Sequence, residues 1–153
     1  MKYIRLTNSD IVVTIDDEDY ERVVRFKWSA NMKEDKLIAI QSSNGSLARI
    51  ILRYFGPLDI DHKDRNPANN QKFNLRIATR SDNNINKSKQ TGNYSSKYKC
   101  VCFDISKGQF RVSISRRGVR YSGGLFDSEI DAAIKANELM IKYHGKFARL
   151  NNV

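Results

Sequence analysis

Four polar side chains in the middle of the chain have the types and spacing for metal-assisted hydrolysis. Asp61 and His62 are adjacent at the end of a short apolar stretch, and Asn74 and Asn83 follow downstream. A carboxylate is a hard oxygen ligand for a divalent cation, and a neutral imidazole can take a proton from water near neutral pH. Such a pair could hydrolyse a phosphodiester with one divalent ion held at the scissile phosphate. The alternative is a turn that contains a hydrogen-bonded histidine.

The other groups that could do chemistry have structural explanations. His144 is expected in the last turn of a C-terminal helix, where an imidazole near the helix carbonyls is an ordinary structural choice. Cys100 and Cys102 are two residues apart, which is awkward for a disulfide and supplies too few ligands for structural zinc, so we expect reduced thiols. The acidic residues 16–19 suit a helix N-terminus, which explains them without a metal site.

Basic charge is concentrated in one part of the chain. The net charge is +10, and residues 61–126 hold 14 basic and 4 acidic groups, whereas the segments on either side are balanced. A field of this kind favours a polyanionic partner, because neutralising phosphates releases condensed counterions. The alternative is a solvated basic surface that only aids solubility.

Composition bounds the class of protein. The 153 residues are 40% hydrophobic, which is enough apolar material for packed cores. Apolar runs, such as residues 37–40 and 50–52, are no longer than four residues, which excludes a membrane-spanning segment, and the first residues lack the apolar core of a signal peptide. We therefore expect a folded, soluble, intracellular protein.

Pattern and composition divide the chain into four segments. Residues 1–56 alternate between strand and helix patterns and are expected to form a mixed β/α scaffold with no chemistry of its own. Residues 57–90 are rich in Asn but keep alternating apolar anchors, which predicts two short strands around a long loop and then a helix. Residues 91–96 have the composition of a linker.

Residues 97–153 predict a three-stranded antiparallel sheet covered by one helix. Turn signals at 107–108 and 117–118 separate three apolar stretches with a period of two. Ser128 followed by Asp131 predicts a helix start, and Gly145 predicts its end. The apolar positions expected to face this helix are Val101, Phe103, Phe110, Val112 and Ile114.

Residues 61–84, DHKDRNPANNQKFNLRIATRSDNN, closely resemble the HNH endonuclease motif of phage and intron-encoded homing endonucleases. The resemblance implies a ββα-metal (His-Me finger) fold with His62 as the general base and Asn74 orienting its imidazole. It implies Asp61 and Asn83 as ligands of Mg²⁺, with Mn²⁺ as a substitute. Many relatives have His at the last position, so Asn83 marks a His-Asn-Asn variant similar to homing enzymes that often nick one strand.

One position departs from the HNH resemblance. Relatives often carry a His-Arg pair on the helix before the motif, whereas this chain has Ala48 and Arg49. If that His assists phosphate or metal placement in relatives, Ala48 implies reduced activity.

The C-terminal segment resembles the ethylene-response-factor type DNA-binding domain of plants. The resemblance lies in residues 98–101, 108–114, 124–128, 131–133 and 147–151. It implies that the sheet enters the major groove. The implied DNA-binding residues are Arg111, Ser113, Ser115, Arg116, Arg117, Arg120 and Ser122.

The match to the plant domain is partial. Cys102, Asp104 and Ser115 stand where plant relatives place arginines. We therefore expect fewer guanidinium contacts to base edges, and phosphate contacts are expected to dominate. The structural alternative is a sheet that packs on another module.

These observations together predict an α+β protein that acts as a metal-dependent homing-type DNA endonuclease. The expected partner is double-stranded DNA, with no membrane, no small-molecule substrate and a monomeric state, in the cytoplasm of a bacterial host or phage-infected cell. The alternative is a catalytically inactive DNA-binding regulator derived from such an enzyme. An RNA-binding protein of the translation machinery is a weaker alternative, because no aromatic stacking platform is evident on the outer sheet face.

Overall fold

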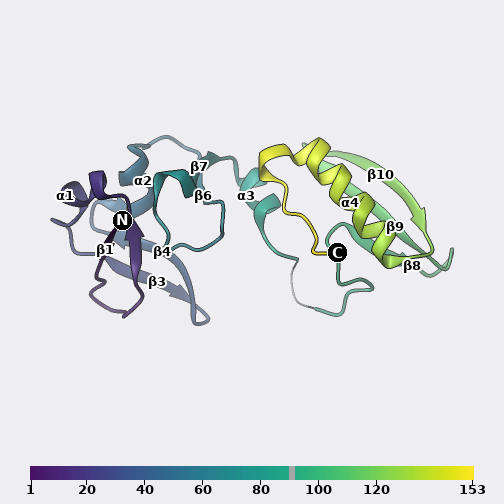
Figure 1. Cartoon of the computed structure of the whole chain (residues 1–153), viewed down its shortest axis with the longest axis horizontal. Coiled ribbons are helices and arrows are strands. Elements are labelled where there is room, and N and C mark those ends of the chain that lie inside the picture. Colours follow the sequence, from purple (N-terminus) through teal and green to yellow (C-terminus); the bar gives the residue numbers. More distant parts are fainter. Residues whose placement is uncertain (90–91) are drawn as a thin grey trace. The chain divides into compact units, whose positions relative to one another are not determined.

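The computed structural model describes residues 1–89 and 92–153 and mixes helices with sheets (Figure 1), which confirms the α+β class. Two compact units, Met1–Arg80 and Ser81–Val153, each have a hydrophobic core. No helix in the described part of the chain has the length and apolar character needed to cross a membrane. Residue 91, the first residue of the expected linker, and residue 90, the last of the segment before it, lie outside the described residues.

The first unit contains short helices and three small antiparallel sheets. β1 pairs with β2, β4 pairs with both β3 and β5, and β6 pairs with β7. The elements are β1 (Lys2–Ile4), β2 (Val13–Ile15), η1 (Asp17–Asp19), α1 (Tyr20–Val23), β3 (Ser29–Lys33), β4 (Lys36–Ser42), β5 (Gly45–Ser46), α2 (Leu47–Leu52), β6 (Asp59–His62), η2 (Lys72–Asn74) and β7 (Leu75–Ala78).

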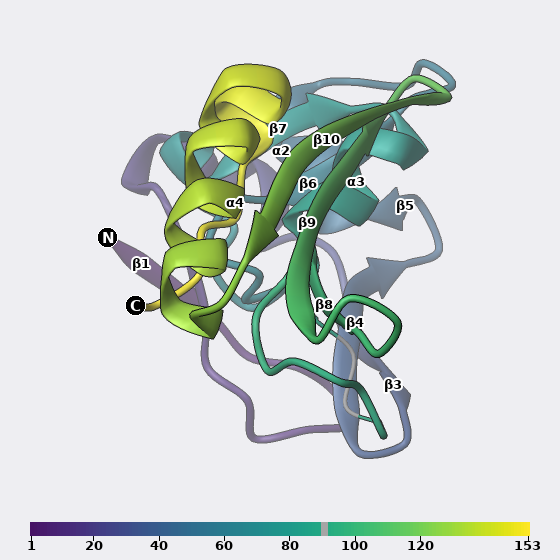
Figure 2. The same cartoon turned by 90° about the vertical axis from the view of Figure 1, so that its right-hand side faces the viewer.

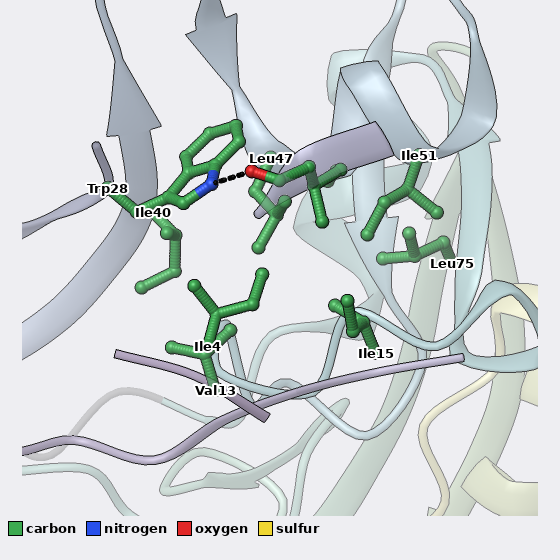
Figure 3. Close-up of a cluster of buried hydrophobic side chains, with 10 residues drawn as sticks. Ile4, Val13, Ile15, Trp28, Ile40, Leu47, Ile51 and Leu75 are labelled. Atoms are coloured by element: carbon green, nitrogen blue, oxygen red, sulfur yellow. Dashed lines mark hydrogen bonds between the residues drawn. The ribbon is translucent and has the colours of Figure 1, made fainter. Parts of the chain in front are cut away.

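One cluster of buried apolar side chains joins the elements of the first unit (Figure 3). Trp28 is buried in it, and its indole N–H donates a hydrogen bond of 2.8 Å to the carbonyl of Val23. Leu75, at the start of β7, packs in the same cluster as Ile4 and Ile15 from the N-terminal strands. Because burial of apolar surface stabilises the folded state, the β6–β7 hairpin and the N-terminal segment stabilise each other.

Arg49 on α2 fixes the segment that leads into β6. Its guanidinium donates to the carbonyl of Gly56 at 2.9 Å and to the carbonyl of Leu58 at 2.7 Å. The residue before it, Ala48, is buried in the core of the unit. Hydrogen bonds from the Arg49 side chain on α2 to these backbone carbonyls therefore hold the segment that leads into β6.

The second unit has a three-stranded antiparallel sheet with one long helix against it (Figure 1, Figure 2). The Ser128 hydroxyl accepts a hydrogen bond of 3.2 Å from the Asp131 N–H, and Gly145 ends the helix with φ of 53°, so both predicted helix ends are confirmed. The elements are α3 (Arg80–Asn86), β8 (Val101–Asp104), β9 (Gln109–Arg116), β10 (Val119–Phe126), α4 (Glu129–His144) and η3 (Gly145–Phe147).

Small residues let α4 lie close to the sheet. Ala132 and Ala133 are fully buried against Val112 of β9. A Cβ atom at Gly123 of β10 would lie 2.6 Å from the Val112 side chain, so only glycine fits at this position. The apolar face expected for the sheet forms the core here, although Phe103 at its edge is 38% exposed.

Candidate active site

Asp61 and His62 lie next to each other on β6, which pairs with β7. Asp61 is opposite Arg76, and His62 is opposite Leu75. Successive side chains of a strand point to opposite faces of a sheet, so the carboxylate and the imidazole lie on different faces of the hairpin.

The Asp61 carboxylate is buried and forms an ion pair with Arg76. The guanidinium Nη2 lies 2.6 Å, and Nε 2.7 Å, from the same carboxylate oxygen, Oδ2. Asp61 is 4% exposed. A buried carboxylate without a partner would be costly, so Arg76 compensates a charge that the fold could not otherwise hold there.

The His62 ring is held by Asn70. Its Nε2 atom lies 3.2 Å from Oδ1 of Asn70, which is buried at 1% exposure. Burial lowers the pKa of His62, while the Asn70 hydrogen bond and the charges of Asp64 and Asp61 act in the opposite direction and offset only part of that effect. The imidazole is therefore neutral at neutral pH, which is the protonation state that a general base needs.

Asn74 organises the loop between β6 and β7. Its amide nitrogen donates to Asp64 Oδ1 and to the carbonyl of Asn69, both at 2.8 Å, and its amide oxygen accepts from the Asp64 N–H at 3.0 Å. The pKa of Asp64 is lowered: burial raises it, but hydrogen bonds from the backbone of Asn66 and the side chains of Asn74 and Asn69 outweigh burial. The carboxylate of Asp64 is thus the centre around which this Asn-rich loop closes.

The N-terminal segment anchors the far side of that loop. Thr14 on β2 donates its N–H to the carbonyl of Ala68 at 2.9 Å, and its carbonyl accepts the N–H of Asn70 at 2.8 Å. Asp16 binds the next two residues, accepting from Gln71 Nε2 at 3.1 Å and from the Lys72 N–H at 2.8 Å. Asp16 precedes η1, but its side chain makes no cap hydrogen bond there, so its carboxylate serves the loop and not the helix start.

The predicted site residues are distributed over both units. Asp61, His62 and Asn74 all belong to the first unit, where the Lys63 N–H donates to the Asn74 carbonyl at 2.9 Å, but the Asp61 and His62 side chains lie on opposite faces of the hairpin. The imidazole contacts the side chain of Asn70, which the sequence does not single out among its many asparagines. Asn83 lies on α3 in the second unit.

The donor chemistry of the predicted ligands fits a hard divalent cation. Within residues 1–89 and 92–153, no three His, Cys, Asp or Glu side chains are grouped so that they could hold a metal ion. The expected set is instead one carboxylate, Asp61, and one amide, Asn83, and both supply the oxygen atoms that Mg²⁺ prefers. A site with few protein ligands leaves coordination positions for water and phosphate.

The predicted DNA-binding residues fall into three groups. Strand alternation and register place five of them on the face opposite α4, with Ser115 beside Arg120 and Ser113 beside Ser122. Arg117 occupies the β9–β10 turn with φ of 50°. The five residues of the outer face are Arg111, Ser113, Ser115, Arg120 and Ser122.

Two of the predicted arginines are paired within the protein. Arg111 forms an ion pair with Asp104, which is on the adjacent strand. Arg116 has the same strand parity as the buried Val112 and Ile114, and its guanidinium forms an ion pair with Asp82 of α3. Arg116 therefore links the sheet to α3 on the side away from the outer face.

His144 has a structural place in the second unit. It is buried, and its Nε2 lies 3.2 Å from the carbonyl of Ser115. Burial lowers its pKa, the Ser115 hydrogen bond opposes this, and the nearby charges of Arg116 and Lys99 lower it further. The ring is therefore neutral and part of the packing between α4 and β9.

Comparison with known proteins bears on the first of these sites. Residues 49–85 match the family model of the HNH endonuclease, a range that contains Asp61, His62, Asn74 and Asn83. A protein of Acanthamoeba polyphaga mimivirus named as an uncharacterized HNH endonuclease is 31% identical over 94 residues, which is 61% of this chain and 47% of that protein.

The chain spans about half the length of that curated relative. No solved structure matches it. The family match ends before the C-terminal sheet, so the homing type and the resemblance to the plant DNA-binding domain stay predictions. What the comparisons establish is that residues 49–85 are similar to an HNH endonuclease domain.

Proposed function

We propose that this protein is a divalent-metal-dependent DNA endonuclease in which His62 activates the attacking water. The observation that carries the proposal is a neutral, partly buried imidazole adjacent to a buried carboxylate, inside the segment that matches the HNH endonuclease family. These are the two groups that hydrolysis of a phosphodiester needs, a base for water and an acidic ligand for a cation.

His62 would act as the general base. Its neutral ring takes one proton from a water molecule, and the oxygen of that water forms the new bond to phosphorus. The bond from phosphorus to the 3′ oxygen breaks, and that oxygen leaves with a proton from solvent. The products carry a 5′-phosphate and a 3′-hydroxyl.

Asp61 and Asn83 would hold Mg²⁺, with Mn²⁺ as a substitute. When bound, the cation would neutralise charge that develops on the phosphate and on the leaving oxygen. Arg76 fixes the orientation of the Asp61 carboxylate through a hydrogen bond from Nε and an ion-pair contact from Nη2 to the same oxygen. Asn74 holds Asp64 and Asn69, and so acts on the site through the loop.

Double-stranded DNA is the proposed substrate, bound by a monomer. The basic excess lies in residues 61–126, which include both the hairpin and the sheet of the second unit. Arg120 on the outer face and Arg117 in the turn would contact phosphates, and the serines between them would allow close approach of the backbone. We further propose that the enzyme nicks one strand of the duplex, in the manner of homing enzymes.

Supercoiled plasmid tests the proposal directly. Incubation with Mg²⁺ is expected to produce open circles or linear molecules, and EDTA is expected to stop the conversion. DNA ligase should reseal the nicks, because sealing requires a 5′-phosphate beside a 3′-hydroxyl. Absence of conversion with both Mg²⁺ and Mn²⁺, or equal conversion in EDTA, would remove the metal-dependent nuclease.

A DNA-binding regulator without cleavage is the second candidate. The observation that favours it is the Asp61–Arg76 ion pair, because the guanidinium competes with a cation for the carboxylate. Titration with Mn²⁺ followed by calorimetry separates the two candidates. A nuclease should bind the ion and lose that binding in Asp61→Asn, whereas a regulator should bind DNA equally with and without the ion.

A further inference from the structure

We propose that Asn70 is the positioning residue that fixes the tautomer of His62, with the ring proton on Nε2. The inference rests on the proposed function in one respect, since the tautomer matters because His62 acts as a base. It adds a residue to the site and gives the N-terminal strand β2 a role in it.

The orientation of the Asn70 amide follows from its second contact. Its Nδ2 atom lies 2.8 Å from the carbonyl oxygen of Pro67, and a carbonyl oxygen can only accept a hydrogen bond. The nitrogen end of the amide must therefore face Pro67, which turns the Oδ1 end toward the imidazole.

The tautomer of the ring then follows from the amide. Asn70 Oδ1 lies 3.2 Å from His62 Nε2, and an amide oxygen has no hydrogen to donate. The hydrogen in this contact must belong to the ring, so Nε2 is protonated and Nδ1 carries the lone pair. Nδ1 is consequently the nitrogen that would take the proton from water.

Backbone contacts fix Asn70 itself. Its N–H donates to the Thr14 carbonyl at 2.8 Å, and two residues earlier the Ala68 carbonyl accepts the Thr14 N–H at 2.9 Å. These two hydrogen bonds join β2 to the loop in a parallel bridge between Thr14 and Asn69. Asn70 is 1% exposed, so its amide is shielded from bulk water.

The chain of contacts runs from the scaffold to the imidazole. Thr14 holds the backbone of Asn70, Pro67 sets the amide, and the amide sets the ring proton. The opposite tautomer would place an N–H where the proposed reaction requires a lone pair. Partners that fix the tautomer of a metal-bound histidine are worth about 10-fold to 100-fold in activity, and we expect a similar loss at His62.

Ring-nitrogen NMR of protein labelled with ¹⁵N-histidine tests the proposal. The chain has two histidines, and the spectrum of His62→Ala assigns them. His144 is an internal control, because its Nε2 faces the carbonyl of Ser115 and must be protonated whatever happens at position 70. In the wild type, both rings are expected in the Nε2–H form.

Asn70→Ala is expected to move only the His62 signals toward a mixture of tautomers and to lower the cleavage rate by about 10-fold or more. Asn44→Ala, at an exposed asparagine of the same unit, should change neither. A wild-type His62 in the Nδ1–H form, or an Asn70→Ala spectrum identical to the wild type, would overturn the proposal.

The wild-type spectrum decides the matter even if Asn70→Ala does not fold, because an Nδ1–H ring contradicts the assignment and an Nε2–H ring supports it. A protein that shows the expected spectra but cleaves no DNA would refute the endonuclease and leave the tautomer assignment in place. The two failures are therefore distinguishable.

Discussion

Asp61 and Arg76 face each other across the β6–β7 hairpin and form a buried ion pair with two contacts to one oxygen, at 2.6 and 2.7 Å. Removing one partner of such a pair leaves an uncompensated buried charge. We expect Arg76→Met to lower the free energy of unfolding by about 3 kcal/mol. Urea unfolding followed by circular dichroism measures the change.

Two further variants are the controls for this prediction: Asp61→Asn alone, and Asp61→Asn combined with Arg76→Met. Asp61→Asn with Arg76→Met removes both charges and should recover much of the loss, because neither charge is left alone. A double variant as unstable as the sum of the single variants would contradict the ion pair as the source of the effect.

Asp16 is expected to stabilise the loop that carries Asn70. Its carboxylate accepts hydrogen bonds from Gln71 Nε2 and from the Lys72 N–H. Asp16→Ala should lower the free energy of unfolding by about 2 kcal/mol, the scale of hydrogen bonds to a charged group. Asp10→Ala, at an exposed aspartate of the same unit, is the matched control, and an equal loss in both variants would show that the loop contacts are not the cause.

His144 is expected to make stability fall with acidity. Burial lowers its pKa in the folded state, so the unfolded chain binds more protons between the folded and the ordinary value. The stabilisation is present above the ordinary histidine pKa and is lost as the pH falls through the lowered one. Unfolding free energies measured from about pH 7.5 down to about pH 5 should decline, and less steeply in His144→Gln. Identical slopes in both proteins would exclude His144 as a source of the pH dependence of stability.

Arg120 and Arg116 should behave differently toward DNA. Arg120 lies on the outer face of the sheet, whereas Arg116 is paired with Asp82 of α3. Arg120→Gln is expected to weaken binding to any duplex and to reduce the salt dependence by about one phosphate contact. Arg116→Gln is expected to lower stability and to leave the salt dependence unchanged. Fluorescence anisotropy over a range of salt concentrations compares DNA binding by the two variants. Equal changes in salt dependence would contradict the placement of Arg120 on the DNA-binding face and Arg116 away from it.

Sequence patterns predict the ends of helices and strands where the determining residues are close in the sequence. The capping residues Ser128 and Gly145 bound α4, because caps satisfy backbone groups within one turn of the helix. The pattern places Asp61 and His62 at the end of a strand, and β6 ends at His62. The adjacency of a carboxylate and an imidazole can be read directly from the sequence.

Contacts between distant parts of the chain are not predictable in this way. The sequence pattern assigns Asp16 to a helix start, but its hydrogen bonds go to residues 55 and 56 positions away. Asn70 is one of many asparagines, and its contact with His62 depends on the loop conformation that Thr14 imposes. The resemblance to the plant domain groups Arg116 with the outer arginines, although strand parity and Asp82 place it on the other side. Each of these cases needs tertiary structure to bring the partners together.

His62 is proposed to take the proton from the attacking water, and the cleavage rate of His62→Ala measures that role. Supercoiled plasmid in Mg²⁺ should be converted by the wild type and by Asn44→Ala at similar rates. His62→Ala, with its fold checked by thermal unfolding, should be slower by about 100-fold to 10,000-fold, the usual contribution of a general base. A folded His62→Ala protein that cleaves as fast as the wild type would show that His62 does not activate the water.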